Sequence, residues 1–407
     1  MRAPTGLTEH NQGNSTPGTP DDRRLGVIFL VGLLSVALVS RVALLSSPYY
    51  ADGPAFVEML GRGLYFARNP PSYFLFLFSA QMLMKTGLSP TAAITALNCF
   101  FSVAGVFVFA KLCELIFPRF LGQLLSAGYA VMNVVWFAGL IHSAYAASSF
   151  LAPLLVYCLL RERKKWYLLG CVTWALCAGF RPSDGAFLFP LLILGSLHRS
   201  WSERVSGGAA AAAVVLAWWV PTAFYYHSVL GPLAKSLSVA GAVSTSVSPL
   251  RGGINPRTLA NILRFVAAVV VSLNILIPHA CLQLLRVRQD RLTLLAATWV
   301  LPGSLFLVLI YMSGAIYISF MAGGLLLLAG LYCRELRPRI ASAWIVACVL
   351  ISTVFMLAAR PVSPDTFPRR VLDAYFLQYT GWSVRHHYGE DLSKMERNAR
   401  SAVPAPH

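Results

Sequence analysis

Residues 26–46 read GVIFLVGLLSVALVSRVALLS, an apolar block in which Arg41 is the only charged residue. An α-helix needs about twenty apolar residues to cross the roughly 30 Å hydrocarbon core of a bilayer. The preceding segment, residues 1–24, is polar and lacks the apolar core and cleavage site of a removable signal peptide. The sequence therefore predicts a membrane-spanning helix that follows a disordered cytoplasmic tail.

Ten further apolar blocks follow along the 407-residue chain. They cover residues 91–111, 120–140, 144–160, 166–180, 184–197, 207–226, 259–285, 292–312, 315–332 and 340–358. Overall, 57% of the residues are hydrophobic and 12% are charged, which is about half the charged fraction of a soluble domain. This composition excludes a soluble globular protein and predicts an all-α polytopic membrane protein with about eleven transmembrane helices.

A shorter block, residues 72–84, reads SYFLFLFSAQMLM and would reach only about 20 Å as a helix. We interpret it as a helix that lies in one leaflet without crossing. Lys and Arg concentrate in short cytoplasmic loops, so the placement of basic clusters tests this interpretation. If residues 72–84 do not cross, the dense clusters fall on the cytoplasmic side with Arg23 and Arg24. These clusters are Lys111–Arg119, Arg161–Lys165, His198–Arg204, Arg286–Arg291 and Arg334–Arg339.

The resulting organisation is a transmembrane domain over residues 25–358 in the cell (inner) membrane, with a cytoplasmic N-terminus. Residues 47–90 and 227–257 are then external loops, and residues 359–407 form an external C-terminal tail.

The charge is strongly basic, with 33 Lys and Arg against 16 Asp and Glu. Orientation in the membrane explains much of this excess. The loop 227–257, however, contains Lys235, Arg251 and Arg257 and no acid, although it is predicted to be external. Either an anionic ligand or attraction to lipid head groups accounts for this bias.

Most of the acids lie in the terminal segments or among basic residues of the cytoplasmic loops, where solvated ion pairing explains them. Only Asp52, Glu58 and Asp184 remain, all predicted at the outer face. Asp52 directly follows the first span, where partial desolvation makes a carboxylate a plausible general base. It is also well placed to cap a short helix starting at Pro54, and the two roles are compatible.

Four arginines are predicted at the same face, Arg41, Arg62, Arg68 and Arg181. Arg181 opens a tight turn that ends at Asp184. Its guanidinium fork suits the oxygens of a phosphate, although a local salt bridge to Asp184 is an equally good reading. Arg41 either contributes to the same site or extends to the membrane surface.

Several short motifs resemble GT-C-type membrane glycosyltransferases, the group that contains the protein O-mannosyltransferases and the aminoarabinose transferases of lipid A. They are Ser40-Arg41-Val42, Tyr49-Tyr50-Ala51-Asp52-Gly53, Gly61–Leu64, Asn69-Pro70-Pro71-Ser72-Tyr73, Gly179-Phe180-Arg181-Pro182 and Ile316–Phe320. Asn69 stands where the similar proteins carry His or Lys, and Gly53 stands where a second acid is common. In this group a helix that does not cross follows the first external loop, as parity also predicts here.

The resemblance implies an inverting glycosyltransferase that moves a sugar from a polyprenyl-phosphate donor to a hydroxyl of a glycan, lipid or protein acceptor at the outer face. Asp52 is then the catalytic base, and the donor phosphate is bound by Arg181, Arg41, Arg62, Arg251 and Arg257. The substrate-binding residues implied are Glu58, Asn69, Tyr73, Asp184 and Tyr317. No metal, cofactor or nucleic acid is expected, and membrane lipids are the remaining partners. The alternative is a transporter or flippase of a lipid-linked anion.

Overall fold

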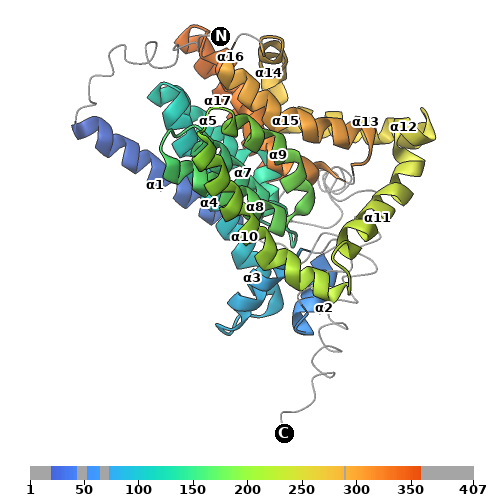
Figure 1. Cartoon of the computed structure of the whole chain (residues 1–407). Coiled ribbons are helices and arrows are strands. Elements are labelled where there is room, and N and C mark those ends of the chain that lie inside the picture. The colour runs from blue at the N-terminus through green and yellow to red at the C-terminus, as the bar shows by residue number, and fades with distance from the viewer. Residues whose placement is uncertain (1–19, 44–52, 65–72, 288–289, 313, 359–407) are drawn as a thin grey trace.

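The computed structural model describes residues 20–43, 53–64, 73–287, 290–312 and 314–358, and the following account concerns these residues. Helices, two 3-10 segments and the connections between them make up this part of the chain (Figure 1). The all-α class predicted from the sequence is confirmed.

The first half of the chain forms α1 (Pro20–Ala43), α2 (Gly53–Gly61), α3 (Phe74–Met84), α4 (Pro90–Ile116), α5 (Arg119–Val131), α6 (Asn133–Ala138), α7 (Tyr145–Leu159), α8 (Lys164–Phe180) and α9 (Pro182–Ser196). The second half forms α10 (Trp201–Tyr225), α11 (Gly231–Val247), α12 (Pro249–Gly252), α13 (Pro256–Leu273), η1 (Asn274–Leu276), α14 (Ile277–Leu284), α15 (Arg291–Leu309), η2 (Ala315–Met321), α16 (Ala322–Cys333) and α17 (Pro338–Ala358). Since α1 begins at Pro20, the last residues of the expected N-terminal tail are helical. The predicted C-terminal tail, 359–407, lies outside the described residues.

Every predicted apolar block contains a helix, but the number of eleven spans is not confirmed. In the described part of the chain, seven helices are long and apolar enough to cross a membrane. Two others, α7 and α9, have 15 residues each, or about 22 Å, which is less than a full hydrocarbon core. The block 120–140 is also not one helix, because it breaks at Met132 between α5 and α6.

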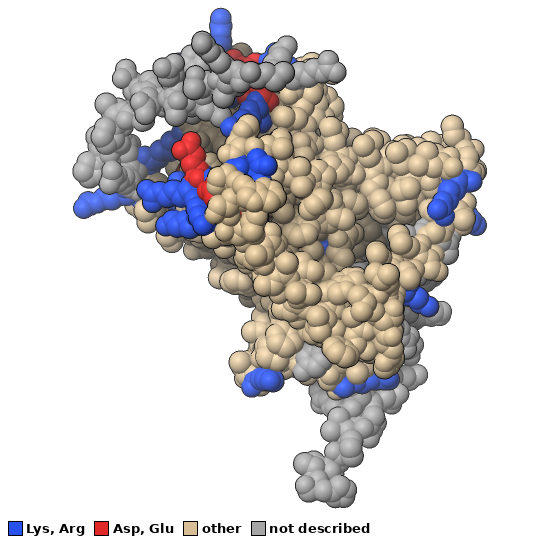
Figure 2. All heavy atoms as spheres, viewed as in Figure 1, with Lys and Arg blue, Asp and Glu red and all other residues tan. Residues whose placement is uncertain are grey.

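Charged side chains gather at one end of the molecule, which we call the charged end (Figure 2). The start of α1, the end of α4 and the start of α5 meet there, around a groove lined by Gly26, Lys111, Glu114 and Arg119. Because α1 starts and α4 ends at the same end, α3 between them does not traverse the molecule. The expectation for residues 72–84 is therefore met, with α3 only 11 residues long.

The later basic loops are tied to each other in pairs. The guanidinium of Arg199 donates hydrogen bonds to the carbonyls of Arg161 and Glu162. An ion pair joins Arg286 to Glu335. Each pair of loops predicted on one side of the membrane is thus adjacent in space.

The core surrounds α16, whose side chains are apolar on every face and nearly all buried. Glycines allow large rings to approach the helix. A Cβ on Gly324 would lie 3.0 Å from Trp299, and one on Gly330 would lie 3.0 Å from Phe117. Small residues serve the same purpose in other helix contacts within membranes.

The break after α5 sets the start of α7. Two side chains of α4 bind carbonyls of the broken segment. Ser102 donates to the carbonyl of Val135 over 2.8 Å, and Asn98 donates to that of Ile141 over 2.6 Å. These bonds replace helical partners and hold the connection that leads to Tyr145, the first residue of α7.

Residues 227–257, predicted as an external loop, are largely helical. They contain α11 and α12, and with α13 they form an arm, residues 231–273, on one side of the molecule (Figure 1). On α13, Thr258 and Asn261 face inward and are buried, whereas Leu259, Leu263 and Val266 are exposed. This inverted amphipathic pattern suits a helix with lipid outside and polar partners inside.

Candidate functional site

Arg181 lies alone between two helices. It follows the last residue of α8 and precedes Pro182, the first residue of α9, with an extended backbone at φ −150° and ψ 98°. A residue before proline is restricted to this region, and proline suits the first position of the next helix. The local sequence therefore forces the turn that Arg181 occupies.

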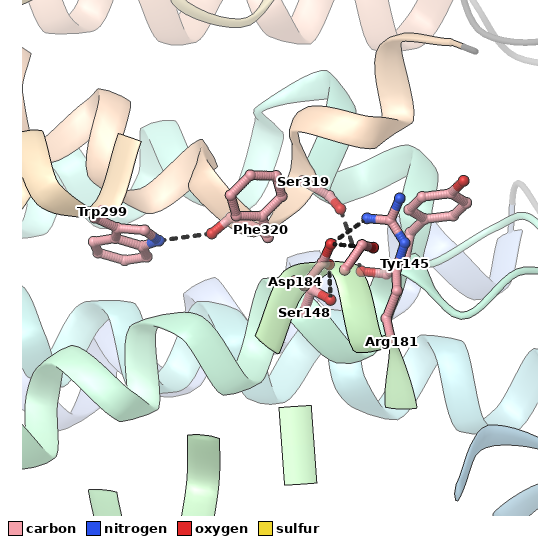
Figure 3. A network of polar contacts seen from close by, with 8 residues as sticks. Tyr145, Ser148, Arg181, Asp184, Trp299, Ser319 and Phe320 are labelled. Atoms are coloured by element: carbon pink, nitrogen blue, oxygen red, sulfur yellow. Dashed lines mark hydrogen bonds and ion pairs between the residues drawn. The ribbon is translucent and has the colours of Figure 1, made fainter. Parts of the chain in front are cut away.

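The guanidinium of Arg181 forms a buried ion pair with Asp184. Nη1 lies 2.5 Å from Asp184 Oδ1, and the side chains are 5% and 0% exposed (Figure 3). The second carboxylate oxygen, Oδ2, accepts a hydrogen bond from Ser148 of α7 at 2.5 Å. Asp184 is thus held on both oxygens, and the salt bridge considered from the sequence is present.

Two tyrosine rings flank the same guanidinium. Its carbon Cζ is 4.1 Å from the ring centre of Tyr145 and 4.8 Å from that of Tyr317. The two ring centres are 5.2 Å apart. Cation–π contacts of this kind stabilise a charge that has left water. Burial alone would lower the pKa of Arg181, but Asp184 and the surrounding tyrosines raise it above its ordinary value, so the side chain stays charged.

The segment between α2 and α3 reaches this cluster through Tyr73. Tyr73 immediately precedes α3 and interacts electrostatically with Arg181. Its ring also meets Phe56 of α2 edge to face, with centres 5.6 Å apart. Helix α2, which starts directly after Asp52, is therefore packed beside the element that contacts Arg181.

We define the Arg181 cluster as Tyr145, Ser148, Arg181, Asp184 and Tyr317. The helix residues next to it are closely packed at two glycines. A Cβ on Gly179 would lie 2.7 Å from Trp218, and one on Gly185 would lie 2.7 Å from the Cα of Ala178. Helix α8 rises from the charged end for 17 residues, or about 26 Å. Arg181, which follows α8, is therefore separated from the charged end by the length of this helix.

The guanidinium of Arg181 has hydrogen-bond donors available for binding an anion. Within the described part of the chain, hydrogen-bond partners are found for Nη1 of Arg181 but not for Nε or Nη2. These donors form one side of the guanidinium fork, the side that a phosphate or carboxylate uses. Among the described residues, no group of three His, Cys, Asp or Glu has the arrangement of a metal site.

Arg41 lies elsewhere and is fully buried. Its Nε donates to Ser102 at 2.8 Å, and its other nitrogens donate to the carbonyls of Ala37 and Ala130 at 3.0 and 3.1 Å. It thus joins α1 to α4 and α5 and shares none of these contacts with Arg181. The structure does not bring the two arginines together.

The other predicted residues are dispersed. Arg62 is exposed and pairs with Glu58 across 2.7 Å on the surface of α2. Arg251 and Arg257 are exposed near α12. Asp52 and Asn69 lie outside the described residues. Of the residues predicted from the sequence, the structure gathers Arg181, Asp184, Tyr317 and Tyr73.

Sequence reasoning missed Tyr145 and Ser148. Both lie at the start of α7, in a block that reads as an ordinary apolar span. Their role depends on the break that precedes α7 and on the packing of α7 against α9. No local sequence pattern predicts the break before α7 or its packing against α9.

Comparisons with known proteins identify the fold. No protein-family model matches the sequence, and no curated protein is similar to it. Two crystal structures of ArnT from Cupriavidus metallidurans are similar in structure. The one bound to undecaprenyl phosphate has a TM-score of 0.61 and 14% identity, over 86% of this chain and 67% of ArnT. The apo structure has a TM-score of 0.57 and 14% identity, over 85% of this chain and 66% of ArnT.

This chain therefore spans about two thirds of the length of ArnT. The structural similarity confirms, at the level of the fold, the resemblance predicted from the short sequence motifs. At this level of identity, the chain shares the fold of the ArnT structures.

Proposed function

We propose that this protein is a membrane glycosyltransferase that takes its sugar from a polyprenyl-phosphate donor. The observation that carries the proposal is the buried Arg181, whose ion pair with Asp184 uses Nη1, in a fold shared with an ArnT structure bound to undecaprenyl phosphate. A lipid phosphate anchored in the bilayer would approach the boundary from the membrane, where this arginine is situated.

Arg181 binds the donor phosphate through Nε and Nη2 in this proposal. Asp184 remains hydrogen-bonded to Nη1, while the rings of Tyr145 and Tyr317 orient the guanidinium through cation–π contacts. The arginine is thereby fixed before the donor arrives, so it needs little reorganisation as negative charge develops on the leaving phosphate. Such preorganised charge is commonly the largest catalytic contribution, on the order of 3 kcal/mol for one donor.

Asp52 is the proposed base. It directly precedes α2, and α2 contacts Tyr73 beside the Arg181 cluster. Asp52 would accept the proton of the acceptor hydroxyl as that oxygen attacks the anomeric carbon. The phosphate would leave from the opposite face, which inverts the configuration.

The membrane orientation is proposed on the same basis. The charged end would face the cytoplasm, because basic loops are retained on that side. The Arg181 cluster would then open toward the outer face, as the prediction of an extracytoplasmic active site in the inner membrane requires.

Vesicles that contain the protein and polyprenyl-phosphate sugars test the assignment. Asp52→Asn is expected to abolish sugar transfer at unchanged protein level and unchanged binding of undecaprenyl phosphate, because it removes the base alone. Arg181→Lys is expected to weaken undecaprenyl phosphate binding by about tenfold or more, because lysine keeps the charge but not the fork.

Three results would count against the proposal. Full sugar transfer by Asp52→Asn would show that Asp52 is not the base. Normal binding of undecaprenyl phosphate by Arg181→Lys would show that Arg181 does not bind the phosphate. Translocation of the lipid-linked sugar without any transfer by the wild-type protein indicates the transporter class.

A further inference from the structure

The last turn of α15 is capped by side chains from the arm. The final carbonyls of a helix lack partners within the helix. In α15, Asn261 Nδ2 donates to the carbonyl of Leu307 at 2.9 Å and to that of Val308 at 3.3 Å. Ser248, at the start of α12, donates to the carbonyl of Leu309. Three consecutive carbonyls are thus bound by two residues of the arm.

Asn261 also fixes the segment that follows α15. Its Oδ1 accepts a hydrogen bond of 2.6 Å from the backbone amide of Met312. The side chain is 1% exposed and uses both its donor and its acceptor groups. A single amide therefore binds the helix end and the first part of the connection after it.

This connection leads directly to the Arg181 cluster. The 3-10 segment η2 begins at Ala315, and Tyr317 N bonds to the carbonyl of Gly314 at 3.1 Å. Tyr317 covers one face of the Arg181 guanidinium, and its ring lies 6.3 Å from that of Tyr311. The end of α15 consequently sets where η2 starts and where Tyr317 is placed.

We propose that Asn261, which belongs to the arm, is a positioning residue for the donor-phosphate site. It holds Tyr317 against Arg181. The inference rests on the proposed function, because the site it serves is the proposed phosphate site. It also gives the basic arm a role without direct contact between Arg251 or Arg257 and the donor. The arm acts on the site through the cap of α15.

A double-mutant cycle on the full-length protein in nanodiscs tests this inference, with undecaprenyl phosphate as the probe. Asn261→Ala is expected to weaken binding about fivefold, and Tyr317→Leu about tenfold, because each reduces the cation–π contact with Arg181. The double variant is expected to bind within about twofold of Tyr317→Leu, since residues that act through one contact are not additive. Ser248→Ala is expected to cause a smaller loss in the same direction.

Asn274→Ala is the matched control. Asn274 is a partly buried asparagine that bonds to Ser352 at 3.1 Å and has a positive φ of 38°. Its substitution is expected to lower the unfolding temperature without weakening undecaprenyl phosphate binding. The unfolding temperature of every variant is measured in parallel, so that a general loss of structure is recognised.

Two results overturn the inference while the proposed function stands. These are unchanged binding by Asn261→Ala, and a double variant whose loss equals the product of the single losses. Failure of the wild-type protein to bind undecaprenyl phosphate contradicts the proposed function itself, and the inference falls with it.

Discussion

Two buried arginines in this protein have opposite surroundings. Arg181 has an acid at 2.5 Å and two neighbouring tyrosine rings against its guanidinium. Arg41 is bound by a serine hydroxyl and by backbone carbonyls. The sequence predicts both near the outer face, where either could contribute to a phosphate site, so it could not separate them. Their contacts assign Arg41 to structure and leave Arg181 as the candidate for ligand binding.

Arg41→Met tests this division. The substitution leaves the hydroxyl of Ser102 and the carbonyl of Ala130 without a donor, so we expect a loss of about 1–3 kcal/mol in the free energy of unfolding. Undecaprenyl phosphate affinity is expected to stay within about twofold of the wild-type value. Thermal unfolding and binding assays on the same preparation provide both values. A large loss of undecaprenyl phosphate affinity without loss of stability would indicate that Arg41 belongs to the donor site.

Arg181 and Asp184 are expected to depend on each other for stability. Arg181→Ala leaves a buried carboxylate without its cation, which costs about 3–5 kcal/mol. The double variant Arg181→Ala with Asp184→Ala removes both charges and should be more stable than Arg181→Ala alone. Chemical unfolding of the three proteins measures this difference. A double variant that is no more stable than Arg181→Ala would show that the pair is not coupled in this way.

At the scale of the element, the sequence predicted where helices lie better than where they break. The apolar blocks located every long helix, because periodicity and length are local properties. Around the break at Met132, side chains of other helices bind backbone carbonyls: Arg41 binds that of Ala130 before it, and Ser102 binds that of Val135 after it. The helix α11 was missed because residues 227–257 are too mixed in composition to read as a span. Neither feature is encoded in a short window.

Close contact between α8 and α9 gives a prediction for the turn that presents Arg181. A Cβ on Gly185 would lie 2.7 Å from the backbone of Ala178. Gly185→Ala should therefore destabilise the protein by about 1–3 kcal/mol through overpacking. The control is Gly208→Ala in α10, where no atom lies within 4 Å of the added Cβ. It should be neutral or stabilising by up to about 1 kcal/mol, and equal effects in thermal unfolding would refute the packing argument.

At the scale of the molecule, the basic loops that lie together at one end of the helices relate the fold to the membrane. The sequence predicted the class, the helix that does not cross and the end at which basic loops collect. The structure confirms the class, and Arg199 and Arg286 each join two of the basic loops. Charged side chains gather at one end of the molecule (Figure 2). The site could be predicted only in part, because Tyr145 and Ser148 come from a span that has no distinguishing motif.

The proposed orientation is testable with single cysteines in a background from which the native thiols are removed. Ser202→Cys lies at the charged end and Thr86→Cys lies after α3, and both positions are exposed. A membrane-impermeant label is expected to reach position 86 in intact cells and position 202 only after permeabilisation. The reverse pattern would invert the orientation and place the Arg181 cluster toward the cytoplasm.

The most direct measurement of the central claim is mass spectrometry of the lipids that copurify with the wild-type protein and with Arg181→Lys. We expect a polyprenyl phosphate that carries one sugar on the wild-type protein, and a marked depletion of that lipid on the variant. Bulk phospholipids alone on the wild-type protein, or equal amounts of the polyprenyl lipid on both proteins, would contradict the proposal that Arg181 holds a lipid-borne phosphate.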